Sequence, residues 1–217
     1  MASNLVPNNS LLPMSVGGAD YVDRVVEVLV AAFSRGALTQ FFLRDPNVPD
    51  NWTSEGIPYE RLKSHFGNLV PPRAEIAELA EAGGWAGVAI WFPPGKSVKP
   101  RDGPVDWRLQ EYLDKVGKVK EEQMKGREYW YLNFIGRHPQ RTEKSVARAL
   151  IDPYLARARA EGVPVWLEAV NPHARDVYEH LGFRTVAELR IGVGKANAMG
   201  EFEEGGEGVP IWCMIVE

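Results

Sequence analysis

The sequence predicts one α/β domain of the α+β kind, in which short strands alternate with helices. The chain has 217 residues, of which 45% are hydrophobic and 25% charged, so it can bury a core and is too apolar for disorder. Its longest ordered pattern runs from Trp130 to Phe183 and reads strand, turn, helix, strand, short helix. No internal repeat or change in composition divides the chain, so we expect a single domain over residues 11–217, after a polar tail at 1–10.

Before residue 130, apolar periodicity and turn residues define the expected elements. They are an edge strand at 11–14, helices at 21–33, 39–43, 59–66 and 106–125, and strands at 75–81 and 85–92. The helix at 106–125 carries Lys118, Lys120, Glu121 and Glu122, which we interpret as a solvated face. After residue 183 we expect strands at 185–191 and 209–216, joined by a glycine-rich loop at 192–208.

Composition narrows the classes of function. A net charge of −4 argues against a general nucleic-acid binder, and no apolar run approaches the ~20 residues of a membrane span. The single cysteine, Cys213, excludes an internal disulfide and is expected to be a buried, unreactive thiol. The first residues lack the pattern of a secretory signal, so we expect a cytoplasmic protein. The sequence leaves the oligomeric state open, and a homodimer is one form it allows.

The turn between the strand at 130–135 and the following helix predicts an anion site. Free backbone N–H groups and the helix dipole favour negative charge at a helix N-terminus. Arg137, Arg141 and Lys144 add positive charge to this turn, so we expect a phosphate-bearing cofactor at the start of the helix near Ser145. The alternative is an ordinary strand–helix–strand unit with a solvated basic turn.

The C-terminal part of this segment resembles a known family. Asn171-Pro172 followed by Tyr178-Glu179 and Gly182-Phe183 resembles the signature of the GNAT acetyltransferase superfamily. The residues Trp166-Leu167-Glu168 resemble the puromycin N-acetyltransferase-like branch. The segments 88–91 and 211–214 resemble the same branch. The resemblance implies a mixed, mostly antiparallel sheet flanked by helices, acetyl-coenzyme A as co-substrate, and transfer of acetyl to a small-molecule amine. The alternative is a GNAT-fold protein that has lost acetyl transfer and uses the same cleft otherwise.

The cofactor turn departs from the family's glycine-rich pattern. The matching residues are Thr142, Glu143, Lys144, Ser145, Val146 and Ala147, and two expected glycines are replaced by Glu143 and Ser145. Glycine permits positive φ and close approach of a pyrophosphate, and Glu143 adds a negative charge beside a negative ligand. We therefore expect that glycine at both positions would tighten cofactor binding and slightly lower the melting temperature.

The resemblance also implies further cofactor contacts. Backbone groups of Phe134, Ile135 and Arg137 would pair with the pantetheine amides as an added strand does. Asn171 would bond the pantetheine arm, cap the helix at Pro172, or do both. The expected cofactor-binding residues are Phe134, Ile135, Arg137, Arg141, Thr142, Glu143, Lys144, Ser145, Val146, Ala147 and Asn171.

Two residues are the catalytic candidates. In the resemblance, a tyrosine at Tyr178 protonates the leaving thiolate; the alternative is a packing tyrosine. Glu168 ends a short apolar strand and is expected to accept the ammonium proton, to orient the amine, or only to form a rim salt bridge, for example to Arg175. His138 and His173 have no spacing typical of a metal site, and no metal is expected. Glutamates in the loop 192–208 would draw a cationic acceptor, unless the loop is solvated and mobile.

Overall fold

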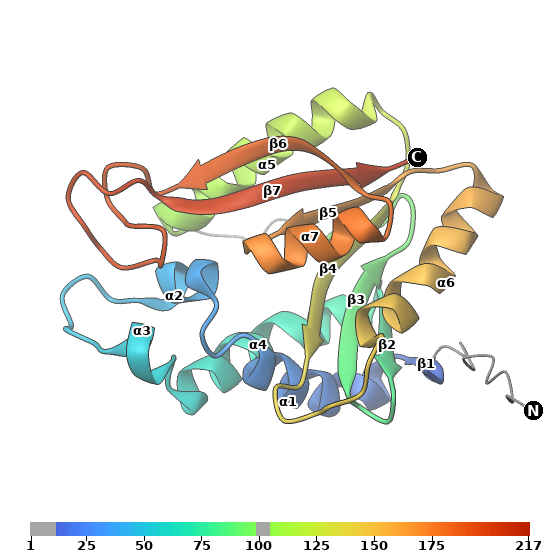
Figure 1. The fold of residues 1–217 in the computed structure, drawn as a ribbon, viewed down its shortest axis with the longest axis horizontal. Coiled ribbons are helices and arrows are strands. Elements are labelled where there is room, and N and C mark those ends of the chain that lie inside the picture. The colour runs from blue at the N-terminus through green and yellow to red at the C-terminus, as the bar shows by residue number, and fades with distance from the viewer. Residues whose placement is uncertain (1–11, 99–104) are drawn as a thin grey trace, which may run out of the picture.

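The fold is built on one sheet of seven strands (Figure 1), seen in a computed structural model that describes residues 12–98 and 105–217. The strand order is β1-β2-β3-β4-β5-β7-β6, and every pairing is antiparallel except the parallel pairing of β4 with β5. This confirms the α+β architecture with a mixed, mostly antiparallel sheet. The strands are β1 (Met14–Gly17), β2 (Glu78–Ala82), β3 (Gly87–Phe92), β4 (Trp130–Arg137), β5 (Val165–Ala169), β6 (Arg184–Ile191) and β7 (Val209–Val216).

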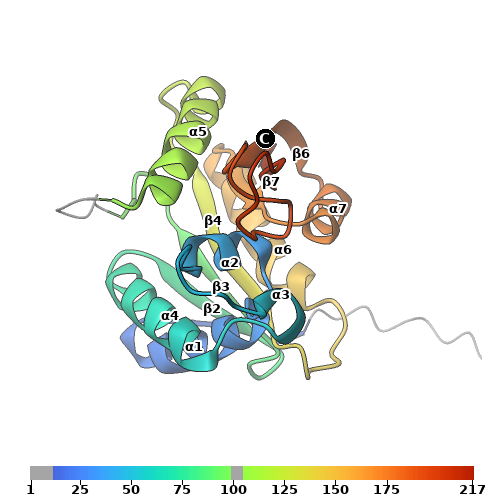
Figure 2. The same cartoon turned by 90° about the vertical axis from the view of Figure 1, so that its left-hand side faces the viewer.

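Helices cover both faces of this sheet (Figure 2). The helices are α1 (Val22–Ala32), α2 (Ala37–Leu43), α3 (Trp52–Glu55), α4 (Tyr59–Ala74), α5 (Trp107–Met124), α6 (Val146–Glu161) and α7 (Pro172–His180), with a 3₁₀ turn at Ala19–Tyr21. Helices α6 and α7 pack on one face. On the opposite face, α1 and α4 cover β2 to β4, while α2 and α5 cover β5 to β7.

The parallel pairing of β4 with β5 is short, and its end creates the opening in the sheet. Only Trp130, Tyr131 and Leu132 pair with β5. Beyond Leu132, β4 continues to Arg137 along β3, while β5 leads into α7, and the two strands separate (Figure 1). Side chains on β5 alternate between the faces, so Leu167 faces α6 and Glu168 faces α5.

An aromatic pair fixes α6 on the sheet. The Tyr154 ring stacks on Trp91 with centroids 4.4 Å apart, and its hydroxyl donates to Glu78 at 2.9 Å. Trp91 Nε1 donates to the carbonyl of Leu150 at 3.2 Å, and Arg157 pairs with the same Glu78 at 2.7 Å. Burial, and then the Glu78 carboxylate, raise the pKa of Tyr154. These contacts hold the middle of α6 against β2 and β3.

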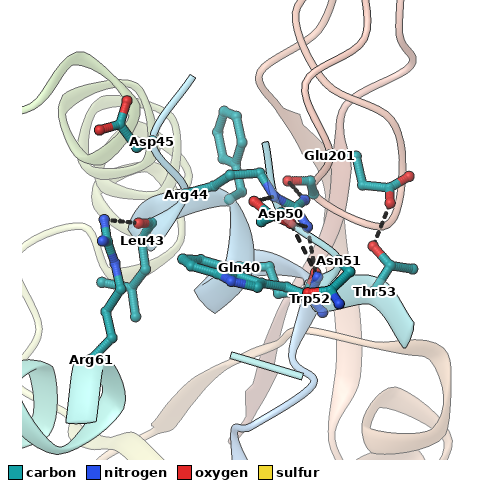
Figure 3. A network of polar contacts seen from close by, with 12 residues as sticks. Gln40, Leu43, Arg44, Asp45, Asp50, Asn51, Trp52, Thr53, Arg61 and Glu201 are labelled. Atoms are coloured by element: carbon teal, nitrogen blue, oxygen red, sulfur yellow. Dashed lines mark hydrogen bonds and ion pairs between the residues drawn. The ribbon is translucent and has the colours of Figure 1, made fainter. Parts of the chain in front are cut away.

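The loop between β6 and β7 is fastened to α2 and α3 (Figure 3). The buried Arg44 makes a two-bond pair with Asp50, at 2.6 and 2.7 Å, and also donates to the carbonyl of Gly200 at 2.7 Å. Thr53 donates to Glu201 in the same loop. The loop is therefore tied to the segments of α2 and α3 at two points, and the carboxylate of Glu201 is already hydrogen-bonded.

Several boundaries differ from the expected ones. Helix α4 runs eight residues past 66, through Gly67 and the exposed pair Pro71-Pro72, because its buried residues Leu62, Phe66 and Val70 keep one apolar stripe. Strand β1 begins at Met14, where the edge strand was expected to end, and the region 45–56 contains the short α3. The expected tail at 1–10 lies outside the described residues.

Membrane-spanning length was tested on the described helices. Among residues 12–98 and 105–217, no single helix is long and apolar enough to cross a membrane. Ala19–Ala32 and Ala37–Leu43 reach that length only as a pair bent by 103°.

Candidate active site

A cavity of about 520 Å³ lies between the turn that begins α6 and helix α7. Seven of the expected cofactor-binding residues line it: Ile135, Arg137, Glu143, Lys144, Ser145, Val146 and Ala147. Arg148, His173 and Tyr178 also line it, so the cavity joins the basic turn to the candidate acid. Phe134, Arg141, Thr142 and Asn171 are not among the lining residues, and all these binding roles stay predictions.

The turn presents backbone donors to this cavity. Ser145 precedes α6 with φ of 63°, a left-handed conformation that a non-glycine residue adopts at a cost. In the described ranges, the N–H groups of Val146, Ala147 and Arg148 have no hydrogen-bond partner, while that of Ala149 bonds Ser145. Three free N–H groups at the positive end of a 16-residue helix suit an anionic ligand.

Arg141 and Glu143 are engaged with each other. The Arg141 guanidinium pairs with the Glu143 carboxylate and donates to the carbonyls of Gly83 and Gly84, at 2.8 and 2.9 Å, in the β2–β3 turn. Hydrogen bonds from Arg141 lower the pKa of Glu143 to about 2. Arg141 thus clips two turns together, and the charge that Glu143 places beside the cavity is compensated. The cations at the cavity are Arg137, Lys144 and Arg148.

Tyr178 is the expected proton donor, and this role stays a prediction. Its side chain is buried on α7 against Phe183, with ring centroids 6.0 Å apart. Burial raises the pKa of the phenol well above its ordinary value, so the group stays protonated. Tyr178 belongs to the cavity wall. A protonated phenol at the wall of a cavity can give its proton to a leaving group there.

Two further expectations concern Asn171 and β4. Asn171 caps α7, accepting from the N–H of Ala174 at 2.8 Å, and Pro172 occupies the first turn, as expected from the sequence. Beyond Leu132, no strand in the described chain pairs with the edge of β4 that faced β5. That open edge includes Phe134 and Ile135, and it could accept an extended ligand.

Glu168 lies on the opposite face of the sheet from Tyr178 and is fully engaged. Its side chain is only 4% exposed and forms an ion pair with Lys120, with 3.3 Å between Oε1 and Nζ. Tyr131 donates to Oε2 at 2.7 Å, and Trp166 Nε1 donates to Oε1. The expected rim salt bridge to Arg175 is therefore wrong, because Arg175 pairs with Asp176 instead.

A chain of polar contacts extends from Glu168 to α4. Asn133 Nδ2 donates to the Tyr131 hydroxyl at 3.2 Å, and Arg73 Nε donates to Asn133 Oδ1 at 2.8 Å. Burial, and then the charge of Glu168, raise the pKa of Tyr131 and of the neighbouring Tyr112. The chain lines the sheet face opposite the cavity, at the point where β4 and β5 separate.

The sequence analysis missed Lys120. Lys120 was expected on the solvated face of α5, but its side chain turns inward. Lys118, Glu121 and Glu122 are exposed as expected. Burial would lower the pKa of Lys120, yet the Glu168 carboxylate holds it above its ordinary value. The signal was available, because Lys120 stands four residues from each of the buried Val116 and Met124.

Comparisons with known proteins agree with this geometry. Residues 108–183, from α5 through α7, match the acetyltransferase (GNAT) family. An uncharacterized protein of Saccharomyces cerevisiae is 26% identical over 88% of this chain and 82% of its own length. An uncharacterized N-acetyltransferase of Schizosaccharomyces pombe is 32% identical over 48% of this chain. The matched part spans 50% of that protein's own length.

A solved structure shows the same fold over nearly the whole chain. A Drosophila melanogaster polyamine N-acetyltransferase, described as catalysing the formation of N-acetylagmatine, covers 94% of this chain and 100% of its own, with a TM-score of 0.61 and 14% identity. The chain thus shares the fold of this enzyme. Residues 108–183 are thus similar to the GNAT acetyltransferase family, and one relative of the chain carries the name of an N-acetyltransferase. The puromycin-type branch stays a prediction.

Proposed function

We propose that the protein transfers the acetyl group of acetyl-coenzyme A to a small-molecule amine. The observation that carries the proposal is the position of Tyr178, a buried and protonated phenol in the same cavity as the free N–H groups of α6. One wall of that cavity can hold phosphates and the other can supply a proton. The cavity therefore combines the two tasks that acetyl transfer from a thioester requires on the leaving side.

Different residues of the cavity would bind different parts of acetyl-coenzyme A. The N–H groups of Val146, Ala147 and Arg148 would hold a pyrophosphate, with Arg137 and Lys144 adding charge. The open edge of β4 at Phe134 and Ile135 would hold the pantetheine arm. Tyr178 would then give its proton to the thiolate as the amine attacks from the opposite face of the sheet.

The acceptor is proposed to be a small organic amine. Support comes from the printed activity of the Drosophila enzyme on a polyamine and from the carboxylate of Glu168 on the acceptor side of the sheet. The proposal includes a cytoplasmic location, supported by the single, buried and unpaired cysteine Cys213, whose pKa burial raises to about 12.

One observation favours a second function. Glu143 and Ser145 stand where the resembling family has glycines, and both line the cavity. A protein that has lost acetyl transfer and binds another small molecule in this cleft would tolerate such a change. Compensation of Glu143 by Arg141 argues for the transferase, because the added charge is neutralised locally.

The test is calorimetric titration with acetyl-coenzyme A, followed by thiol release with agmatine, 2-phenylethylamine and a histone-like peptide as acceptors. We expect saturable binding and turnover of the amines in preference to the peptide. Absence of heat at millimolar acetyl-coenzyme A with a folded sample would support the second function. Preferred turnover of the peptide would contradict the small-amine acceptor.

A further inference from the structure

The ammonium of Lys120 lies inside a cage of aromatic rings closed by a carboxylate. Its Nζ is 3.9 Å from the ring centroid of Tyr131, 5.6 Å from that of Trp166 and 5.8 Å from that of Tyr129. Glu168 closes the cage at 3.3 Å. Aromatic faces and a carboxylate around one cation are the general chemistry by which proteins recognise alkylammonium groups.

The cage walls are fixed independently of Lys120. Glu168 is held by Tyr131 and Trp166, and Tyr131 is held in turn by Asn133. Tyr131 lies on β4, Trp166 and Glu168 lie on β5, and Tyr129 directly precedes β4, whereas Lys120 comes from a helix on the outside of the sheet. A lysine has a flexible four-carbon stem, and this one keeps 18% of its side chain exposed. The occupant can therefore move without dismantling the cage.

The cage also stands at the right place for an acceptor. Glu168 is the first residue of β5 beyond its pairing with β4, so it lies at the opening of the sheet. The cavity with Tyr178 lies on the other face at the same opening. An amine held by Glu168 would add to the carbonyl carbon of an acyl group placed at the opening, and the thiolate would leave on the side of the cavity.

We propose that this cage of Tyr129, Tyr131, Trp166 and Glu168 is the ammonium subsite for the acceptor, and that Lys120 is its resident occupant, which an acceptor displaces. The proposal rests on the proposed acetyl transfer to a small amine. It has a consequence for Glu168, which can take a proton from the acceptor only after the ion pair with Lys120 has opened. Lys120 is thus a specificity-determining residue, because only a cation that competes with a lysine ammonium gains the subsite.

The decisive experiment empties the cage and offers it a substitute cation. Lys120→Ala is titrated with n-butylammonium chloride, which reproduces the lysine stem and charge, with 1-butanol as the neutral control. Acetyl-coenzyme A is absent, and binding is followed by calorimetry, by tryptophan fluorescence and by the melting temperature. We expect butylammonium to bind Lys120→Ala at least about tenfold more tightly than wild type and to raise its melting temperature, with no effect of butanol.

Matched variants separate the subsite from general effects. Lys118→Ala removes an exposed lysine of the same helix and should bind butylammonium no better than wild type. Glu168→Gln in the Lys120→Ala background should abolish the gain. Lys120→Gln keeps a donor for Glu168, and it replaces Lys120→Ala as the test if the alanine variant does not fold.

The outcomes distinguish this inference from the proposed function. Folded Lys120→Ala or Lys120→Gln that binds butylammonium no better than wild type would overturn the subsite, as would binding that survives Glu168→Gln. Butylammonium binding without any acetyl transfer would leave the subsite standing and contradict the transferase. Acetyl transfer by wild type, together with no gain in butylammonium binding in the Lys120 variants, would support the transferase and contradict the subsite.

Discussion

Tyr178 carries the sharpest expectation at the scale of single residues. Tyr178→Phe keeps the ring against Phe183 and removes the proton that the cavity exposes. We expect turnover to fall by roughly 10²–10⁴-fold with little change in acetyl-coenzyme A affinity. Because burial raises the pKa of this phenol, the loss should be the same at every pH at which the enzyme works. Steady-state kinetics with calorimetry measures both, and parallel losses of rate and affinity would assign Tyr178 to packing.

Ser145 shows what the sequence could and could not reveal about one residue. The sequence identified it as a missing glycine, and its φ of 63° shows that the backbone still adopts the conformation that favours glycine. The expectation that glycine lowers the melting temperature is therefore corrected for position 145. The hydrogen bonds from Arg141 to the carbonyls of Gly83 and Gly84 had no sequence signal, because these glycines lie far away in the chain.

Ser145→Gly should consequently stabilise the protein. Relief of the left-handed strain, about 1–2 kcal/mol, exceeds the backbone entropy that glycine adds, about 0.5–1 kcal/mol. A net gain near 1 kcal/mol would raise the melting temperature by roughly 2–4 °C. Ser145→Ala removes the hydroxyl and keeps the strain, so it is the control that should gain nothing. An equal shift for both variants in thermal unfolding would refute the backbone argument.

At the scale of elements, the turn before α6 separates a binding cation from a structural one. Lys144 lines the cavity, whereas Arg141 clips the turn to β2–β3. Lys144→Ala should weaken acetyl-coenzyme A binding by about 1 kcal/mol, roughly fivefold, and more strongly at low salt. Arg141→Ala combined with Glu143→Gln removes the clip together with the charge that it compensates, so this double variant should lower the melting temperature and leave affinity close to wild type. Calorimetry at two salt concentrations decides, and the reverse pattern would return Arg141 to the phosphate site.

The boundaries of helices and strands were predicted best where the hydrophobic residues follow one dominant periodicity. Strand β7 matches the expected 209–216, and α5 differs from the expected 106–125 by one residue at each end. Helix α4 was expected to end at 66, yet it continues through Gly67, Pro71 and Pro72, because tertiary packing of Val70 overrides the weak helix preference of these residues. The ion pair of Lys120 could not be predicted for a related reason. Its partner Glu168 belongs to a strand that the sequence alone does not place next to α5.

At the scale of the whole molecule, Arg44 joins parts of the chain that are far apart in sequence (Figure 3). Gly200, with φ of 80°, lets the β6–β7 loop approach so closely that an added Cβ would lie 2.2 Å from the carbonyl of Ala37. No local pattern predicts this contact, because it depends on the assembled sheet. The segment from 130 to 183 was predictable as a motif, and its setting within the molecule was not.

Arg44→Met should therefore destabilise the protein. It leaves the carboxylate of Asp50 without its partner at a site where both side chains are largely buried, which costs about 3 kcal/mol. Arg24→Met, at an exposed pair with Glu27, is the control and should change stability by less than about 0.5 kcal/mol. Urea unfolding measures both, and similar effects of the two substitutions would contradict the role of burial.

The same pair predicts how stability depends on pH. Hydrogen bonds from Arg44 lower the pKa of Asp50 in the folded state. A lowered pKa contributes stability that is complete above the ordinary carboxylate value near 4 and is lost as the pH falls below it. The difference in unfolding free energy between wild type and Arg44→Met should therefore be constant near neutrality and shrink below about pH 4. A difference that grows on acidification would rule out this ion pair as the cause.

The short junction of β4 with β5 also governs how the chain reaches its native state. Strands β1 to β4 join through antiparallel neighbours, and β5, β7 and β6 form a second antiparallel set. Only three residue pairs of a parallel ladder unite the two sets, and that ladder cannot form until the crossover through α6 has been closed. Closing a long connection for so few hydrogen bonds is entropically expensive, so the two sets should gain structure before they dock. The step that completes folding is then also the step that shapes the opening where acetyl transfer is proposed to occur.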